Sequence, residues 1–330
     1  MKRVVDYMIM IVLLLCFMPV QALAGDVRLE RTAVMRDIDM ELYEFYTDHT
    51  QGLEICCSIC PEYAAVFENA SGTFSVLLGD AVSSIRNEHY EVIDFLEYDA
   101  ALLDANKQKY TLSSGCSPCL ALAETVQGYS QEGLPQTLAQ TALFHSEKYR
   151  VNPEQEFTDG LVSTVRYQWR ASGKKRTCRL SIPKTWGKAV AESSTKKTQY
   201  RSAFGNGIPF FSIQYEPAKR VRTESAVMQE LQRRVSTEIL EKQYGAVELL
   251  AQGVQRLGNT QSIWVMFSTK GSESHGAGFY YNWYMLVDGT VLVFESGVSG
   301  TKALPAFEQE SIFRKYYETL REIAVSSVIG

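Results

Sequence analysis

The chain changes character at Val162-Ser-Thr-Val-Arg-Tyr-Gln-Trp-Arg-Ala171, which is followed by Ser172-Gly-Lys-Lys-Arg-Thr-Cys-Arg-Leu-Ser-Ile182. Apolar and polar residues alternate through both segments. Strict alternation is typical of a strand with one buried face, and the Ser-Gly pair between the segments is typical of a turn. The sequence therefore predicts a β-hairpin that ends at Pro183.

Beyond this hairpin the sequence predicts more strands and two helices. A strand at 208–215 precedes a helix that begins at Thr223, a hydroxyl N-cap, and ends at Gly245. Asp288-Gly289 is the strongest two-residue hairpin signal in the chain. The order predicts an α+β fold, an antiparallel sheet covered by helices. The remaining predicted elements are strands at 262–267, 278–287 and 290–294 and a closing helix at 307–323.

Three packing expectations follow for this region. The spacing of Val227, Leu231 and Val235 predicts the buried face of the helix that begins at Thr223. Trp186 is expected to pack on the sheet just after Pro183. The aromatic run at 279–284 alternates between the two faces of one strand, which indicates core packing, with a ligand-lining wall as the alternative.

The segment before the hairpin shows the helical period instead. Apolar residues recur every three or four positions, and β-branched runs are few. This pattern predicts a bundle of four or five helices. The expected helix ends are at Gly52, near Gly72, near Gly79 or 87–89, and at 133–135. The expected organisation is a signal peptide at 1–24, an acidic helical domain at 25–150 and a sandwich domain at 151–330.

One motif in the second half resembles a known family. Leu180-Ser-Ile-Pro-Lys-Thr-Trp186 is similar to the opening of PsbP-like domains, the family that includes PsbP, DcrB and LpqN. The later strands and helices follow in the same order, so the resemblance covers about 157–330. It implies an α-β-α sandwich and an accessory or binding role without catalysis. It transfers no catalytic residue, and the acidic helical half lies outside it.

The first residues look like an export signal. Lys2 and Arg3 precede eleven apolar residues at 8–18, and Ala22-Leu-Ala24 supplies the small residues of a cleavage site. Eleven helical residues rise only about 16 Å, against a hydrocarbon core of about 30 Å, which disfavours a membrane anchor. A lipoprotein is disfavoured because Leu15 precedes Cys16. We expect an exported, periplasmic or secreted chain with no transmembrane span after cleavage.

Charge is unevenly placed along the chain. Residues 25–165 hold 23 acidic and 8 basic residues, whereas 166–222 hold 14 basic and 2 acidic residues. Such asymmetry is compatible with pairing between the two segments, or with a protein or anionic envelope partner. Export argues against nucleic acid. The loop expected at 187–205 is rich in Ser, Thr and Lys, and its candidate contact residues are Lys188, Lys196, Lys197 and Arg201.

Cysteines are the sharpest chemical feature. Six remain after removal of Cys16, and five of these lie in the helical half. Structural disulfides are favoured in an oxidising compartment, with 15 full connectivities open. The alternatives are a Cys₄ zinc site and a redox pair at Cys116 and Cys119. The disulfide candidates are Cys56, Cys57, Cys60, Cys116 and Cys119, and at least one bond is expected between the first three and the last two.

The sequence gives only weak signals for other metal-binding, catalytic or phosphate-binding motifs. The four histidines show no metal-ligand spacing, no Gly-x-Ser-x-Gly motif is present, and Gly205-Asn-Gly207 lacks the Lys of a phosphate loop. No metal, cofactor or catalytic residue is therefore expected. The favoured interpretation is a non-enzymatic accessory or binding protein of the cell envelope. The alternatives are an exported thiol–disulfide oxidoreductase, and a docking factor that acts through the basic segment at 166–222.

Overall fold

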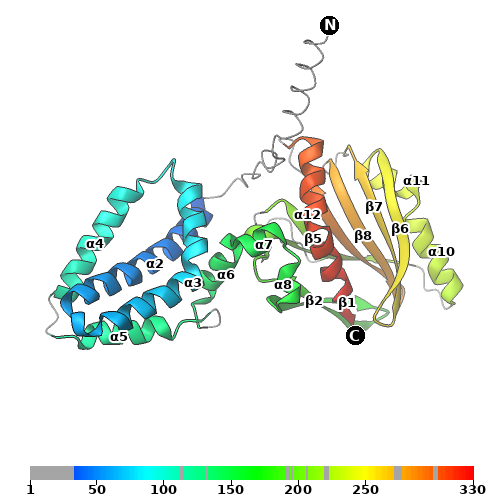
Figure 1. Cartoon of the computed structure of the whole chain (residues 1–330). Helices are drawn as coiled ribbons and strands as arrows, with labels where there is room; N and C mark the ends of the chain where they lie inside the picture. Colours follow the sequence, from blue (N-terminus) through cyan, green and yellow to red (C-terminus); the bar gives the residue numbers. More distant parts are fainter. Residues whose placement is uncertain are drawn as a thin grey trace, which may run out of the picture. The chain divides into compact units, whose positions relative to one another are not determined.

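A computed structural model describes residues 33–111, 115–130, 133–189, 194, 196–205, 207–218, 223–270, 277–299 and 304–330. The expected signal peptide lies outside the described residues. Among the described residues, no helix is both long and apolar enough to cross a bilayer. The chain has a helical region followed by a sheet region, as the sequence predicted, and the α+β class is confirmed (Figure 1).

The helical region is built from amphipathic helices around one core. Its largest buried side chains include Leu42, Phe67 and Phe74, and two cysteine-linked helices close one end. The period-3.6 pattern is the cause, since each helix offers one apolar stripe. The elements are α2 (Ala33–Ile59), η2 (Pro61–Tyr63), α3 (Ala64–His89), α4 (Phe95–Thr111), α5 (Ser117–Gln127), α6 (Gln136–His145), α7 (Glu147–Val151) and α8 (Gln155–Thr158).

Two predicted helix ends in this region, at Gly52 and near Gly72, are wrong, and of the two positions offered for the next break Gly79 is not the one used. Gly52 lies inside α2, and Gly72 and Gly79 lie inside α3. A glycine costs a helix only about 1 kcal/mol, which packing can offset. At Gly52 the packing is visible, because a Cβ there would lie 3.0 Å from Tyr110 and 3.0 Å from Leu122. The break predicted near 87–89 and the one at 133–135 are confirmed.

The sheet region contains a seven-stranded and a three-stranded antiparallel sheet. Their strand orders are β3-β4-β5-β9-β8-β7-β6 and β1-β2-β10. The strands are β1 (Val162–Ala171), β2 (Lys174–Pro183), β3 (Gly187–Lys188), β4 (Lys197–Arg201), β5 (Pro209–Pro217), β6 (Val247–Leu257), β7 (Thr260–Thr269), β8 (Gly278–Val287), β9 (Thr290–Ser299) and β10 (Val328–Ile329). The helical segments are α9 (Ser202–Gly205), α10 (Glu224–Arg234), α11 (Thr237–Tyr244) and α12 (Ala306–Val325).

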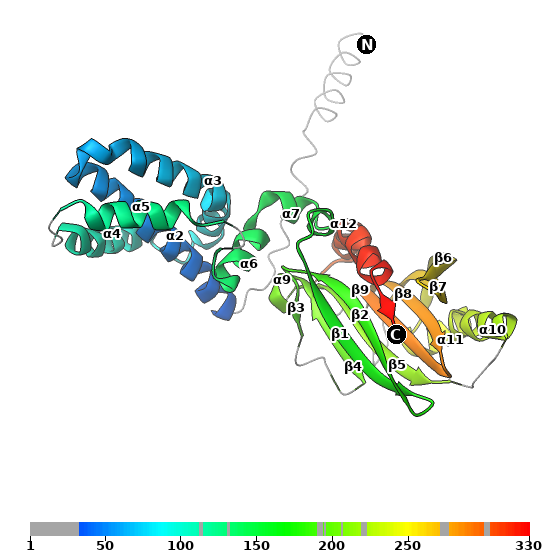
Figure 2. The same cartoon turned by 90° about the horizontal axis from the view of Figure 1, so that it is seen from below.

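Strand β8 shows how the large sheet separates two cores. Trp283 packs on one face with α12 and the β1–β2 hairpin, whereas Tyr280 and Tyr284 pack on the other face with α10 and α11. Figure 2 shows the hairpin on one side of the large sheet and α10 and α11 at the opposite side. The aromatic run therefore forms core, as predicted. Trp186 is buried in the same core as Trp283, 6.2 Å from the Tyr316 ring.

Two corrections concern the other predicted elements of the sheet region. The helix predicted from Thr223 to Gly245 is two helices, because Ser236 has an extended backbone between α10 and α11. The segment at 187–205, predicted as a loop, contains β3 and β4, which extend the sheet beyond β5. Strand β6 was not predicted, and its alternation is interrupted by an irregular register between Leu249 and Ala251.

The predicted hairpins are confirmed. Strands β1 and β2 pair from Val162↔Pro183 to Ala171↔Lys174, and β8 pairs with β9 across Asp288-Gly289. Asp288 and Gly289 both have positive φ, as the tight turn of such a hairpin requires. Thr223 caps α10, since its hydroxyl accepts a hydrogen bond from the backbone N–H of Ala226 at 3.2 Å.

Candidate functional site

The β1–β2 hairpin has one apolar face and one cationic face. Tyr167, Trp169 and Cys178 are buried in the core beneath it. The residues between them alternate outward, because successive side chains in a strand point to opposite faces. Figure 2, which looks toward β1 and β2, shows no helix over the hairpin along most of its length. We call the outward set the hairpin cationic face; it consists of Arg166, Arg170, Lys175 and Arg179, all exposed.

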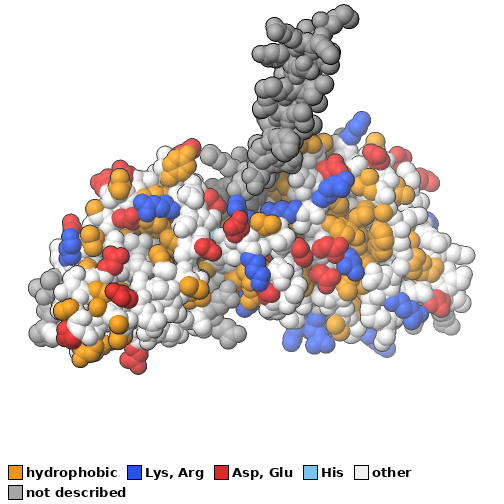
Figure 3. Space-filling model, in the orientation of Figure 1, with side chains coloured by type: hydrophobic (Ala, Val, Ile, Leu, Met, Phe, Trp, Pro, Cys, Tyr) orange, Lys and Arg blue, Asp and Glu red, His pale blue; other side chains and the backbone are white. Residues whose placement is uncertain are grey.

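These four cations oppose one another in two cross-strand pairs. Arg166 is the partner of Arg179, and Arg170 is the partner of Lys175. Directly opposed like charges on a sheet destabilise it, by amounts on the scale of 0.2–1 kcal/mol. Within the part of the chain that the structure describes, no ion pair or side-chain hydrogen bond compensates any of the four. Basic side chains also gather on the lower surface of the sheet region in Figure 3.

The four contact residues proposed from the sequence have a different setting. Lys188 and Lys196 are exposed. Lys197 places its Nζ 3.2 Å from the Glu295 carboxylate, whose side chain is only 3% exposed. Arg201 donates from Nη1 to the carbonyls of Gly207 and Ile208. Lys197 and Arg201 therefore have structural partners within the chain.

Sequence reasoning found the basic segment but missed which residues share a face. The signal was available in the alternation, since 166, 170 and 179 adjoin buried positions of the hairpin and 175 lies opposite 170. It could be used only once the register was known, because a shift of one residue exchanges the two faces of a strand.

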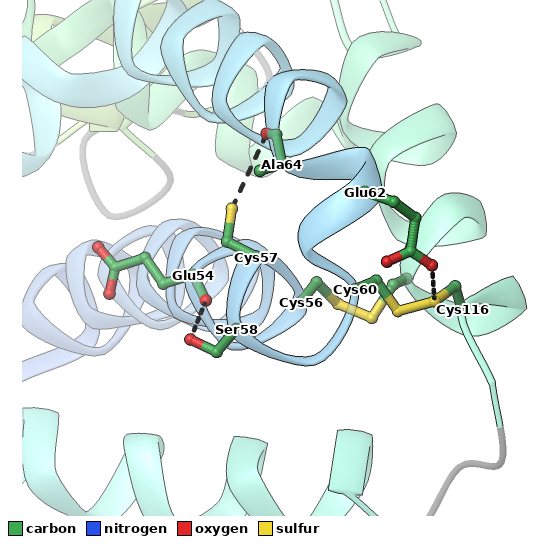
Figure 4. Close-up of a disulfide and its surroundings, with 9 residues drawn as sticks. Glu54, Cys56, Cys57, Ser58, Cys60, Glu62, Ala64 and Cys116 are labelled. Carbon is green, nitrogen blue, oxygen red and sulfur yellow. Dashed lines mark hydrogen bonds between the residues drawn. A yellow bond between two sulfur atoms is a disulfide. The ribbon is translucent and has the colours of Figure 1, made fainter.

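The cysteines of the helical region form two disulfides between α2 and α5. Cys56 is bonded to Cys119 and Cys60 to Cys116, with Cα–Cα distances of 5.5 and 5.9 Å. Figure 4 shows the two bonds side by side, with the Glu62 carboxylate 3.4 Å from the Cys116 sulfur. Cys56 lies near the end of α2 and Cys60 directly follows that helix. Cys119 lies near the start of α5 and Cys116 directly precedes it. The two bonds therefore link the end of α2 to the start of α5.

The fifth cysteine of this group, Cys57, is not bonded. Its sulfur points away from both disulfides, toward the carbonyl of Ala64 at 3.9 Å (Figure 4). Burial, followed by the charges of Glu68 and Glu54, raises the pKa of the Cys57 thiol. Burial raises the pKa of Cys178 in the sheet region to about 12. Neither thiol has the lowered pKa of a reactive cysteine.

This pairing bears on the two chemical alternatives for the cysteines. Cys116 and Cys119 are bonded to cysteines of α2 and its end, not to each other, so they do not form a Cys-x-x-Cys redox pair. The same four sulfurs, as disulfides, offer no thiolate to a Cys₄ zinc site. The structure therefore favours the structural role for these cysteines.

A buried carboxyl lies at the start of the sheet region. The Glu156 carboxylate of α8 accepts hydrogen bonds from the Thr185 hydroxyl at 2.6 Å and from the Thr185 backbone N–H at 3.2 Å. Burial raises the pKa of Glu156 to about 7, although these hydrogen bonds act in the opposite direction. The hydrogen bonds between Glu156 and Thr185 connect α8 to the segment that follows β2.

Comparison with known protein structures gives similarities at low sequence identity and low TM-score. No protein family and no curated protein matches the chain. The solution structure of cyanobacterial PsbP (CyanoP) from Synechocystis sp. PCC 6803 is similar, with a TM-score of 0.35 and 11% identity over 51% of this chain and 93% of that chain. The crystal structure of PA94 from Pseudomonas aeruginosa, of unknown function, has a TM-score of 0.26 and 9% identity over 48% and 94%. We base no functional inference on these similarities.

Proposed function

We propose that this chain is an exported accessory protein of the cell envelope that docks onto an anionic membrane surface through the hairpin cationic face. The observation that carries the proposal is the pair of like-charge contacts, Arg166 with Arg179 and Arg170 with Lys175. These contacts weaken the isolated fold but concentrate positive charge on one exposed face. An anionic surface would relieve the repulsion and use the charge.

The chemistry of the face favours lipid headgroups over a protein partner. Protein interfaces concentrate their binding energy in buried aromatic and Arg anchors that fill pockets. The outward positions of β1 and β2 carry no aromatic side chain, and the neighbouring exposed apolar residue on β10 is Val328. Each Lys or Arg near an anionic membrane contributes about 1 kcal/mol, so four of them suffice for weak, salt-sensitive binding.

Export is supported by the two disulfides. Such bonds persist in oxidising compartments and are rare in the cytosol. Together with the cleavage signal expected at 1–24, they favour a chain that folds after crossing the inner membrane. The role proposed here needs no catalytic residue.

Vesicle binding tests the proposal directly. Purified chain beginning at Gly25 is sedimented with vesicles of phosphatidylglycerol and phosphatidylcholine, or of phosphatidylcholine alone. We expect binding to the anionic vesicles only, weakening steeply from 0.05 to 0.5 M salt because the charges are exposed. The variant Arg166→Thr/Arg179→Thr should bind about tenfold or more weakly, since two such charges contribute about 2 kcal/mol.

A matched control removes two exposed lysines elsewhere. The variant Lys107→Ser/Lys242→Ser changes the net charge equally but leaves the hairpin cationic face intact. It should bind as the parent does. Equal weakening of binding by the arginine variant and the lysine control, or binding to neither kind of vesicle, would contradict the proposal and favour a protein partner instead.

A further inference from the structure

The helical region contains a buried cluster of two histidines around one carboxylate. The Asp39 Oδ2 atom lies 3.0 Å from His89 Nε2, and Asp39 Oδ1 lies 2.8 Å from His145 Nε2. All three side chains are at most 7% exposed. They come from α2, α3 and α6, which are far apart in sequence.

The cluster has a sequence signal that is easy to miss. Asp39 falls on the apolar stripe of α2, three and four residues before the buried Leu42 and Tyr43. A carboxylate at such a position needs partners, because burying an unpaired charge costs several kcal/mol. His89 is the last residue of α3 and His145 the last of α6, so two helix ends converge on it.

The outer nitrogen of His145 faces further polar groups. Its Nδ1 lies 3.3 Å from the Ser84 hydroxyl and 3.6 Å from the Glu88 carboxylate. Metal-binding histidines commonly donate the second ring N–H to a carboxylate, which fixes the tautomer that leaves the other nitrogen open for the metal. Glu88 is one-third exposed, so the cluster has a polar edge toward solvent through which an ion could enter.

We propose that this cluster is a zinc-type metal site, bound by the Asp39 carboxylate and by Nε2 of His89 and His145, with Glu88 positioning His145. Two imidazoles and one carboxylate suit Zn²⁺, whereas Mg²⁺ and Ca²⁺ prefer all-oxygen sites. Ligand atoms in a tetrahedral zinc site lie about 3.3 Å apart for bonds of about 2.0 Å. The Asp–His distances of 2.8 and 3.0 Å are close to this value, but the two Nε2 atoms contact different oxygens of Asp39, so binding one ion requires the two imidazoles to move toward each other.

Binding requires a simple rearrangement of protons. An imidazole that donates its Nε2 proton to Asp39 must present an Nε2 lone pair to the ion instead. In His145 the ring proton then sits on Nδ1 and is donated to the Ser84 hydroxyl, which itself donates to Glu88, while Asp39 exchanges its two hydrogen bonds for a bond to the metal. Three protein ligands leave a fourth position for water or an incoming ligand, as in open zinc sites.

Metal titration tests the site. Chain treated with a chelator, in a Cys57→Ser background that removes the partly buried free thiol of the helical region, is titrated with Zn²⁺ and with Co²⁺. We expect one ion per chain, and four-coordinate Co²⁺ absorption bands. His145→Gln and His89→Gln should abolish stoichiometric binding, and Glu88→Gln should weaken it about 10- to 100-fold.

The histidine of α2 provides the matched control. His49 hydrogen bonds to the Phe45 carbonyl at 2.7 Å and lies among aromatic rings. His49→Gln should leave binding unchanged. Glu88→Gln keeps the test decisive if the buried variants fail to fold, because Glu88 is partly exposed. Absence of stoichiometric binding in the folded parent, or equal loss in His49→Gln and Glu88→Gln, would overturn the proposal.

Discussion

Arg179 and Arg166 stand directly opposite each other on adjacent strands, and both are exposed. A sheet selected only for stability would place an acid or a threonine at one of these positions. Retaining two such pairs in one hairpin is therefore better explained by binding than by folding. The Lys197–Glu295 pair has the opposite character, since the half-buried Lys197 satisfies a carboxylate buried inside the fold.

Substitution of Arg179 should separate binding from stability. Arg179→Thr removes one opposed charge and introduces a good strand-forming residue, so the free energy of unfolding should rise by about 0.2–1 kcal/mol. Urea unfolding followed by circular dichroism measures it, with Lys242→Ser expected to stay within about 0.5 kcal/mol of the parent. A loss of stability in Arg179→Thr would show that the residue has an internal role.

Glu156 should make stability depend on pH. Its pKa of about 7 in the folded chain exceeds the ordinary value of 4.5, so the folded state holds this proton up to higher pH than the unfolded state does. Its contribution is complete below about pH 4.5 and is lost as pH rises through 7, by roughly 3 kcal/mol. Glu156→Gln should flatten this part of the profile, measured by urea unfolding from pH 4.5 to 8. If Glu156→Gln left the pH dependence of the unfolding free energy unchanged, Glu156 would not be its source.

At the level of elements, the two disulfides are nested. Cys60–Cys116 closes 56 residues inside the 63 closed by Cys56–Cys119. Once one bond is formed, the other closes only a short remaining loop and restricts the unfolded chain little further. Their contributions should therefore be far from additive.

This nesting predicts a specific pattern of stability losses. Cys56→Ala/Cys119→Ala and Cys60→Ala/Cys116→Ala should each cost about 2 kcal/mol while the other bond remains. The variant without either bond should cost about 6 kcal/mol, more than the sum of the two, because the long loop that then opens contributes about 4 kcal/mol by itself. Guanidinium unfolding without reductant measures all three. If either pair alone costs as much as the four-alanine variant, the nested arrangement is wrong.

Helix α10 is anchored to the large sheet by Leu231, which is fully buried. Leu231→Ala should cost about 2–5 kcal/mol, because it leaves a cavity under the helix. Val254→Ala on β6, where the side chain is 59% exposed, should change stability by less than about 0.5 kcal/mol. Thermal unfolding of both variants provides the comparison, and similar values for the two would mean that the helix face is misassigned.

At the level of the whole molecule, local signals predicted most elements. The alternation at 162–182 and the Asp288-Gly289 turn were sufficient for two hairpins, because both signals lie within a few residues. Gly52 shows the limit, since its place inside α2 depends on Tyr110 and Leu122 from other helices.

The candidate sites depended on longer-range information. The cysteine pairing was one of many possible connectivities, and the hairpin cationic face required the strand register. The Asp39 cluster required three helices to converge, which no periodicity in one segment can reveal. In each case the missing information was a contact between segments distant in sequence.

The most direct test of the account is where the chain resides in cells. The chain from Met1, and its variant Arg166→Thr/Arg170→Thr/Lys175→Thr/Arg179→Thr, are expressed in a Gram-negative host, fractionated, and analysed by intact mass with thiol alkylation. We predict that both are exported and cleaved before Gly25 with two free thiols, and that only the parent sediments with membranes until high salt releases it. Retention in the cytosol of the uncleaved chain with seven reactive thiols, or identical membrane association of parent and variant, would contradict the account.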